Sequence, residues 1–244
     1  MQTDSRNSIL TGDAYMRAIS ARAADRDARS AFQKTVLEVA PPRGRIFDFG
    51  AGPGTDAKFY AEHGFRVFAY DVDVEMCATF LVHCSEQITT ERVTLIESPY
   101  DELLSGAPLR DVRDIDLVTA NFAPMNLVPD PQRAFETFHS IVADRGRLLL
   151  SVLNPSFIGD MRYRWFWTNR RQLWRDGHFV IRGSGPQNVV WRRSVGEFTR
   201  LSAAGFRLRK VLRGLPTPPW WTAAPMRWLA RPTSQFLFLL FDKR

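Results

Sequence analysis

The chain has 244 residues, of which 45% are hydrophobic, and a formal net charge of +7. This length fits one α/β domain with an insertion, and the apolar fraction supports a full core. The N-terminus lacks the apolar stretch of a signal peptide, and the longest apolar run, 236–241, is too short to span a bilayer. Cys77 and Cys84 belong to no cluster with metal-ligand spacing. We therefore expect a cytoplasmic protein with no metal site and no membrane partner.

Strand and helix patterns alternate along the chain. The predicted helices are one or two at 12–40, then 55–63, 73–87, 100–106, 130–143 and 194–204. The predicted strands are 44–49, 66–71, 93–97, 114–121, 147–153, 206–213 and 234–242. Such alternation implies right-handed crossovers and a mostly parallel sheet with helices on both faces. The last two strands have no clear helix between them, which favours an antiparallel pair at the sheet edge. We expect a single domain over 1–244, with an N-terminal helical cap at about 10–40.

A glycine-rich turn follows the first predicted strand and is the most informative segment. The apolar run ends in Asp48, three glycines follow at every second position (Gly50, Gly52, Gly54), and Asp71 ends the next strand. Glycines let a ligand approach the backbone, and a carboxylate can accept both hydroxyls of a ribose. The dinucleotide fingerprint G-x-G-x-x-G does not fit, because the third glycine falls one place early. This pattern predicts an adenosine-containing ligand.

These residues resemble motif I and the following acidic loop of the class I S-adenosylmethionine (SAM)-dependent methyltransferases. Further stretches are similar to later elements of that family, namely 70–76, 116–126, 145–152, 204–206 and 235–241. The resemblance implies an enzyme with a Rossmann-like doubly wound sheet, SAM as cofactor and S-adenosylhomocysteine as product. It is specific for the cofactor and says little about the methyl acceptor.

The resemblance also implies which residues bind SAM. Ligands of such sheets lie beyond the carboxyl ends of the strands, so we expect Asp71 at the ribose and Val72 at the adenine. Ser98 stands where relatives often have an aspartate. The SAM carboxylate needs a cation, and Tyr15 with Arg22 are candidates because a spacing of seven can place both on one helix face. The full expected set is Tyr15, Arg22, Asp48, Gly50, Ala51, Gly52, Gly54, Asp71, Val72, Met76, Ser98, Pro99, Asn121, Phe122 and Ala123.

An insertion rich in arginine and aromatic residues occupies about 155–193. It follows the fifth predicted strand and holds four of the seven tryptophans. We interpret it as a lid that forms the acceptor pocket, because rings give flat apolar walls and arginine can stack on or pair with an acceptor. The alternative is a small subdomain with these rings as its core and the arginines as its solvated face. The expected pocket residues are Trp165, Trp167, Trp191 and Trp220.

Methyl transfer by in-line displacement depends mainly on orientation, and it needs a base only for a protonated acceptor. Tyr100 and Asn126 could orient the acceptor, and His178 in the lid could act as the base. The hypothesis is O- or N-methylation of a small planar or anionic metabolite. One alternative is an RNA methyltransferase that uses the basic, aromatic insertion, although no RNA-binding module is recognisable. Another is a non-catalytic SAM-binding protein. The oligomeric state stays open.

Overall fold

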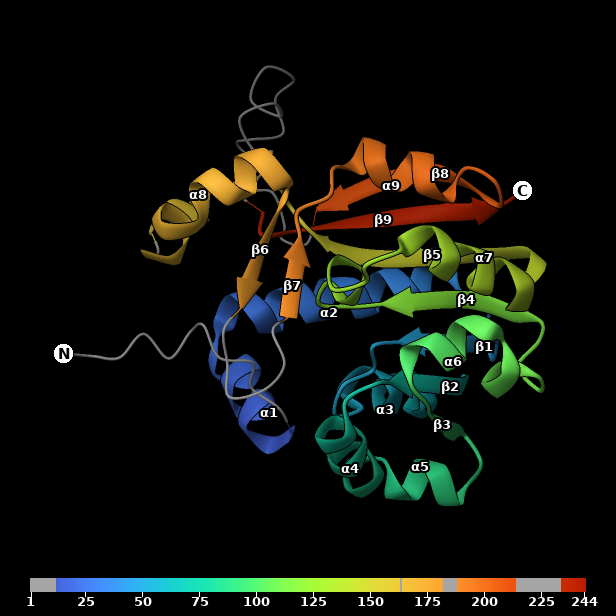
Figure 1. Cartoon of the computed structure of the whole chain (residues 1–244). Coiled ribbons are helices and arrows are strands. Elements are labelled where there is room, and N and C mark those ends of the chain that lie inside the picture. Colours follow the sequence, from blue (N-terminus) through green and yellow to red (C-terminus); the bar gives the residue numbers. More distant parts are fainter. Residues whose placement is uncertain (1–11, 163, 182–187, 214–233) are drawn as a thin grey trace.

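The computed structural model describes residues 12–162, 164–181, 188–213 and 234–244. Its main sheet has seven strands in the order β3-β2-β1-β4-β5-β9-β8 (Figure 1). Strands β1 to β5 are parallel, whereas β9 runs antiparallel to both β5 and β8. The predicted parallel sheet with an antiparallel last strand is therefore confirmed, although β9 lies inside the sheet and β8 forms its edge. The strands are β1 Arg45–Phe49, β2 Arg66–Asp71, β3 Val93–Glu97, β4 Ile115–Ala120, β5 Val142–Leu153, β8 Phe206–Arg213 and β9 Phe236–Lys243.

Helices cover both faces of this sheet, as predicted. Alternate residues of a strand point to opposite faces, so Ile46 of β1 packs with Phe32 and Tyr60, whereas Phe47 packs with Phe138 in a second core. One face carries α2 Ala23–Val39, α3 Thr55–Glu62, α4 Val74–His83 and α5 Ser85–Thr89; the other carries α6 Tyr100–Ser105, α7 Pro131–Ile141 and α9 Val195–Ser202. Short turns of 3-10 helix are η2 Ala107–Leu109, η3 Pro124–Asn126 and η4 Ile158–Arg162.

Side-chain caps fix several helix starts. The carboxylate of Asp73 accepts a hydrogen bond from the backbone N–H of Met76 at the start of α4, and the hydroxyl of Ser194 accepts one from Glu197 in α9. Each such cap satisfies an amide that has no partner within its helix, and its loss typically costs about 1 kcal/mol.

Among the described residues no helix combines the length and the apolar character needed to cross a membrane.

The N-terminal cap consists of two helices, α1 Gly12–Ala21 and α2, which separate at Arg22. Arg22 has an extended backbone (φ −94°, ψ 120°), so the expectation that Tyr15 and Arg22 share one helix face is wrong. Helix α1 packs on α4, where Gly12 approaches the hydroxyl of Thr79.

The insertion folds separately from the main sheet. It contains η4, helix α8 Arg164–Asp176 and a two-stranded sheet of β6 His178–Ile181 and β7 Asn188–Trp191. In Figure 1, α8, β6, β7 and α1 lie beyond the carboxyl ends of the parallel strands. This is the edge at which α/β sheets of this kind bind ligands.

Candidate active site

Three glycines shape the turn between β1 and α3, each with positive φ (72° at Gly50, 56° at Gly52, 83° at Gly54). A Cβ at Gly50 would lie 2.5 Å from Cβ of Pro124, and one at Gly54 would lie 2.5 Å from Sγ of Cys84. Packing therefore requires glycine at these two positions. At Gly52 a Cβ would meet the Met76 sulfur at 3.9 Å and the Tyr15 ring at 4.0 Å, which is ordinary van der Waals contact. Packing alone therefore does not require glycine here, whereas close approach of a ligand to the backbone would.

Asp71 ends β2 directly beside this turn. Its Oδ2 accepts a hydrogen bond from the Gly52 backbone N–H at 2.7 Å, and its Oδ1 accepts one from the Asp73 N–H at 2.9 Å. Burial raises the pKa of the Asp71 carboxyl, and the backbone donors oppose that rise. Each oxygen retains a second lone pair, so the carboxylate can still accept ribose hydroxyls. Val72 follows with 59% of its surface exposed, as expected for a residue that could lie against a nucleobase.

Asp48 lies behind the turn and not on its surface. Its side chain is buried, and its Oδ1 accepts a hydrogen bond from the Thr119 hydroxyl at 2.7 Å. Burial, together with the negative charge of Asp56, raises the pKa of Asp48 to about 7, while the bond from Thr119 opposes this. Asp48 is therefore bonded to β4 through Thr119 and exposes almost none of its surface.

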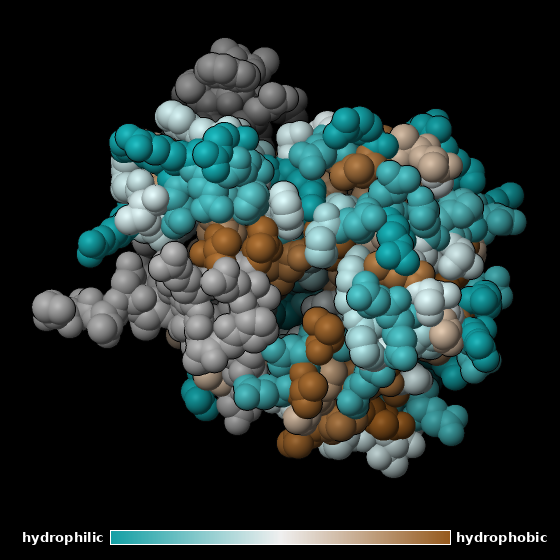
Figure 2. All heavy atoms as spheres, in the orientation of Figure 1, coloured by the Kyte–Doolittle hydropathy of each residue, from teal (hydrophilic) through white to brown (hydrophobic). Residues whose placement is uncertain are grey.

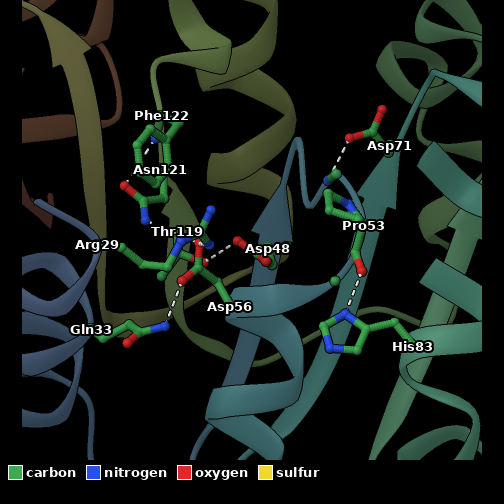
Figure 3. A network of polar contacts seen from close by, with 12 residues as sticks. Arg29, Gln33, Asp48, Pro53, Asp56, Asp71, His83, Thr119, Asn121 and Phe122 are labelled. Atoms are coloured by element: carbon green, nitrogen blue, oxygen red, sulfur yellow. Dashed lines mark hydrogen bonds and ion pairs between the residues drawn. The ribbon is translucent and has the colours of Figure 1, made fainter. Parts of the chain in front are cut away.

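A network around Asp56 joins the turn to the loop after β4 (Figure 3). The Asp56 carboxylate, in the first turn of α3, pairs with the Arg29 guanidinium and accepts hydrogen bonds from Gln33 (2.8 Å) and Asn121 (3.0 Å). The Asn121 side chain also accepts a bond from the Phe122 N–H at 2.9 Å, and the Arg29 guanidinium lies 4.6 Å from the Phe122 ring centroid. Arg29, Gln33 and Asp56 were not among the residues expected from the sequence, although Asp56 directly follows the glycine turn.

This network holds strained backbone in place. Phe122 (φ 60°) and Ala123 (φ 65°) adopt consecutive left-handed conformations, and each such residue costs about 1–2 kcal/mol. The Asn121 side chain fixes the first of them, and the Asn126 N–H donates to the Ala123 carbonyl at 3.0 Å. The strain lies in the loop that the resemblance assigns to the cofactor.

The remaining expected cofactor residues lie around the same turn, with one exception. The Tyr15 ring would come within 4.0 Å of a Cβ at Gly52, and burial raises its pKa to about 12. The Met76 sulfur approaches the same point, and Ala51 donates its N–H to the Tyr70 carbonyl. Ser98 and Pro99 follow β3, where the Ser98 carbonyl accepts from the Tyr70 hydroxyl at 3.2 Å.

The exception is Arg22, whose side chain is 62% exposed and pairs with Asp25 at 3.8 Å, away from Tyr15.

A cavity of about 600 Å³ lies between the start of α2, the loop after β4, β9 and the insertion. Figure 2 shows the molecule hollowed between the insertion and the main body. One aromatic wall is Trp165 stacked on Phe179, with ring centroids 4.8 Å apart and planes at 25°. The lining residues are Arg22, Ala24, Asp25, Phe122, Ala123, Asn126, Leu127, Leu153, Phe157, Asp160, Arg162, Trp165, Phe179, Val190, Arg192, Gln235 and Phe236.

Of the three expected pocket tryptophans that lie within the described residues, only one lines this cavity. That residue is Trp165. Trp167, two positions further along α8, is 47% exposed and donates its indole N–H to the Met161 carbonyl at 2.8 Å. The Trp191 ring packs against His178, with centroids 4.6 Å apart. Trp220 lies outside the described residues.

The expected catalytic residues are not brought together at the cavity. Asn126 lines it, but its amide is engaged on both sides: Nδ2 donates to the Trp191 carbonyl and Oδ1 accepts from the Leu153 N–H at 3.0 Å. His178 contacts the Gln172 side chain and the Asp176 carbonyl and does not line the cavity.

Tyr100 is likewise no part of the cavity lining. Its buried hydroxyl has no hydrogen-bond partner among the described residues, and burial raises its pKa. Asn126 therefore fastens the insertion to the sheet, and neither His178 nor Tyr100 lines the 600 Å³ cavity.

Charged residues that the sequence analysis missed hold this part of the molecule together. Arg192 pairs with Asp160 and donates to the Asn154 carbonyl at 2.9 Å, and its guanidinium lies 5.7 Å from the Trp165 ring centroid. Arg193 is buried and donates to the backbone carbonyls of Met125 and Pro129, each at 3.1 Å. No sequence pattern distinguishes these two arginines from the other basic residues of the insertion.

Asp25 is the second carboxylate of the cavity. It lies in the first turn of α2 and is only 8% exposed. Burial raises the pKa of its carboxyl, and the positive charges of Arg22 and Arg29 oppose that rise. No group of three or more His, Cys, Asp or Glu side chains in the described ranges is arranged to hold a metal ion.

Comparison with known proteins adds independent findings. A family model described as "Methyltransferase domain" matches residues 20–210. A search of curated proteins found no match.

Among solved structures, a putative SAM-dependent methyltransferase from Listeria monocytogenes is similar, with a TM-score of 0.62, 15% identity and coverage of 88% of this chain and 97% of that one. A 1,6-didemethyltoxoflavin-N1-methyltransferase from Burkholderia thailandensis has a TM-score of 0.57 and 19% identity, with coverage of 97% and 92%. A geranyl diphosphate C-methyltransferase from Streptomyces coelicolor has a TM-score of 0.58 and 14% identity, with coverage of 88% and 76%. At these identities the likeness is one of fold.

The family match spans most of the chain, and its residues include the glycine turn, Asp71 and the loop after β4. The strand order and the glycine turn that follows β1 agree with it. The chain belongs to the methyltransferase-domain family and is a class I SAM-dependent methyltransferase.

Proposed function

We propose that the enzyme methylates an oxygen or nitrogen atom of a small planar, anionic metabolite bound in the 600 Å³ cavity. The observation that carries this proposal is the aromatic wall of Trp165 and Phe179, which stands in a cavity whose rim carries arginine. A volume of this size holds a single small molecule. The nearly parallel rings offer flat apolar surface for a planar acceptor.

The charges of the cavity favour an anion. Arg192 is neutralised by Asp160, and Arg22 is paired with Asp25. Arg162 is exposed at the cavity and has no carboxylate partner among the described residues. One positive charge is therefore left over, and a guanidinium can pair with a carboxylate or stack on a planar group. The toxoflavin-type methyltransferase among the structural neighbours acts, by its name, on a small molecule, which is consistent with this proposal.

The chain would hold the cofactor at the glycine turn, with Asp71 at the ribose hydroxyls and Val72 beside the adenine. The Phe122–Ala123 loop is shared, because both residues line the acceptor cavity and directly follow Asn121 of the Asp56 network. SAM supplies an electrophilic methyl group on a sulfonium. The contribution of this chain is to orient the acceptor and to exclude water, which can account for about 7–11 kcal/mol of a displacement barrier.

An acceptor that arrives as a hydroxyl or amine must lose a proton. In this proposal the proton goes to Asp25, because its carboxylate faces the cavity and its raised pKa makes it a better base than an ordinary aspartate. Asp160 is less suited because it forms a largely buried, hydrogen-bonded ion pair with Arg192, whereas the ion pair of Asp25 is longer (3.8 Å) and its Arg22 side chain is 62% exposed. His178 does not line the cavity.

A direct test is methyl transfer from radiolabelled SAM to a panel of aromatic hydroxy- and amino-carboxylates, with total RNA as a separate acceptor. Trp165→Ala should lower turnover at least about tenfold, the factor that loss of about 1.4 kcal/mol of binding gives. Trp167→Ala is the matched control on the same helix and should leave turnover unchanged. Transfer to RNA alone, or equal losses in the two variants, would contradict the proposal. Calorimetric titration with S-adenosylhomocysteine shows whether either variant disturbs the cofactor site.

A further inference from the structure

Helix α8 carries tryptophan and arginine on the face that points away from the cavity. Trp165 points inward, whereas Trp174 is 82% exposed and Trp167 is 47% exposed. A spacing of seven residues is about two helical turns, so Trp167 and Trp174 share one side of the helix. No residue of α8 is buried, and in Figure 1 the helix stands at the edge of the molecule, apart from the seven-stranded sheet.

This face is strongly basic. Residues 164–176 contain four arginines and one acid, Asp176, which binds Arg175 through two hydrogen bonds of 2.8 and 3.0 Å. The other arginines, Arg164, Arg170 and Arg171, are exposed and form no ion pair within the described part of the chain. Three uncompensated positive charges therefore surround the two exposed indoles. In Figure 2 the α8 region at the upper left is covered by hydrophilic and pale residues.

We propose that this outward face of α8 docks on an anionic lipid bilayer. Indole rings favour the boundary between water and hydrocarbon, because the ring is apolar and its N–H is polar. Helices with aromatic residues on one side and arginine beside them lie in that boundary, and anionic headgroups attract the basic side chains. No membrane partner was expected from the sequence because no apolar run is long enough to span a bilayer, but docking at the surface requires no span.

The shape of the face favours a bilayer over a single-stranded nucleic acid. Proteins bind single strands in basic grooves whose aromatic rings stack on successive bases. Here Trp167 and Trp174 project from a convex helix and do not line the cavity. A flat bilayer surface can meet such a ridge along its whole length. Because Trp165 lies on the inner side of the same helix, docking would bring the cavity close to the membrane.

The test is flotation of the full chain with vesicles of phosphatidylcholine alone and of equimolar phosphatidylcholine and phosphatidylserine. We expect binding only to the anionic vesicles, weakened by added salt. The double variant Arg170→Gln/Arg171→Gln should bind about 25-fold less tightly, about fivefold per arginine, as about 1 kcal/mol per basic residue at such a surface implies. Trp174→Ala should bind at least about tenfold less tightly, because the indole would bury a large apolar area when it enters the bilayer.

Two control variants match these changes elsewhere on the surface. Val82→Ala shortens an apolar side chain of α4 that is 79% exposed, and Arg110→Gln/Arg200→Gln removes two exposed arginines outside α8. Unchanged vesicle binding of both controls, beside losses in the α8 variants, supports the proposal. Absence of vesicle binding, or equal losses in the controls, overturns it. Binding of polyuridylate in place of vesicles would also overturn it and assign this face to nucleic acid. Any of these outcomes leaves the proposed methyl transfer untouched.

Discussion

Asp48→Asn should change how the stability of the protein depends on pH. Asp48 is 2% exposed, its Oδ2 has no hydrogen-bond partner among the described residues, and its pKa is raised to about 7. In the unfolded chain an aspartate titrates near 3.9. Between about pH 4 and about pH 7 the native state therefore binds a proton that the unfolded state has lost, so this group lowers stability as the pH rises.

The magnitude follows from the pKa change. A pKa raised from 3.8 to about 7 corresponds to about 4 kcal/mol, at about 1.36 kcal/mol per pKa unit. Asparagine keeps an oxygen for the Thr119 hydroxyl but carries no charge. The variant should thus be the more stable protein at about pH 8, by up to about 4 kcal/mol, and should lose most of this advantage near about pH 4.

The assay is urea unfolding of the parent, Asp48→Asn and Asp111→Asn at a series of pH values. Asp111 is an exposed carboxylate and controls for the change in net charge. The slope of stability against pH should flatten in Asp48→Asn without vanishing, because burial also raises the pKa values of Asp25 and Asp71. Parallel pH profiles for the parent and Asp48→Asn would refute the reasoning, since they would mean that Asp48 titrates alike in the folded and unfolded states.

Three further predictions concern the cofactor site. Asp71→Ala should weaken SAM binding by about 1–3 kcal/mol, the cost of an unmade charge-assisted contact; unchanged calorimetric affinity in a folded variant would remove the ribose assignment. Gly54→Ala should lower the free energy of unfolding by about 1–3 kcal/mol because its Cβ would clash with Cys84. Gly52→Ala adds the strain of a positive φ but no clash, so it should cost less stability and should also weaken SAM binding. Comparable unfolding midpoints for the two would contradict this difference. Asn121→Ala should lower the free energy of unfolding by about 1–3 kcal/mol, because it removes a donor to Asp56 and the acceptor of the Phe122 N–H. An unaltered midpoint of urea unfolding would count against that network.

The local features of this protein could be predicted from the sequence. Three alternate glycines between an apolar strand and a helix permit only a tight turn, and Asp71 follows at the end of the next strand. Alternating strand and helix patterns predicted the parallel sheet and its covering helices because those periods arise within one element. The resemblance to methyltransferases depended on the same short segments, and the family match confirmed it.

Tertiary structure decided which of several equivalent residues face the site. Trp165 and Trp167 are two positions apart, so they point to nearly opposite sides of α8, and only the packing of that helix on Phe179 selects Trp165 for the cavity. Asn126 has the side chain of a candidate catalytic residue, yet its amide joins β5 to β7, whose Trp191 is distant in sequence. Such choices depend on contacts between elements, and no local pattern encodes them. The sequence by itself therefore determined the fold and the glycine turn, whereas the folded chain alone determined which side chains line the 600 Å³ cavity.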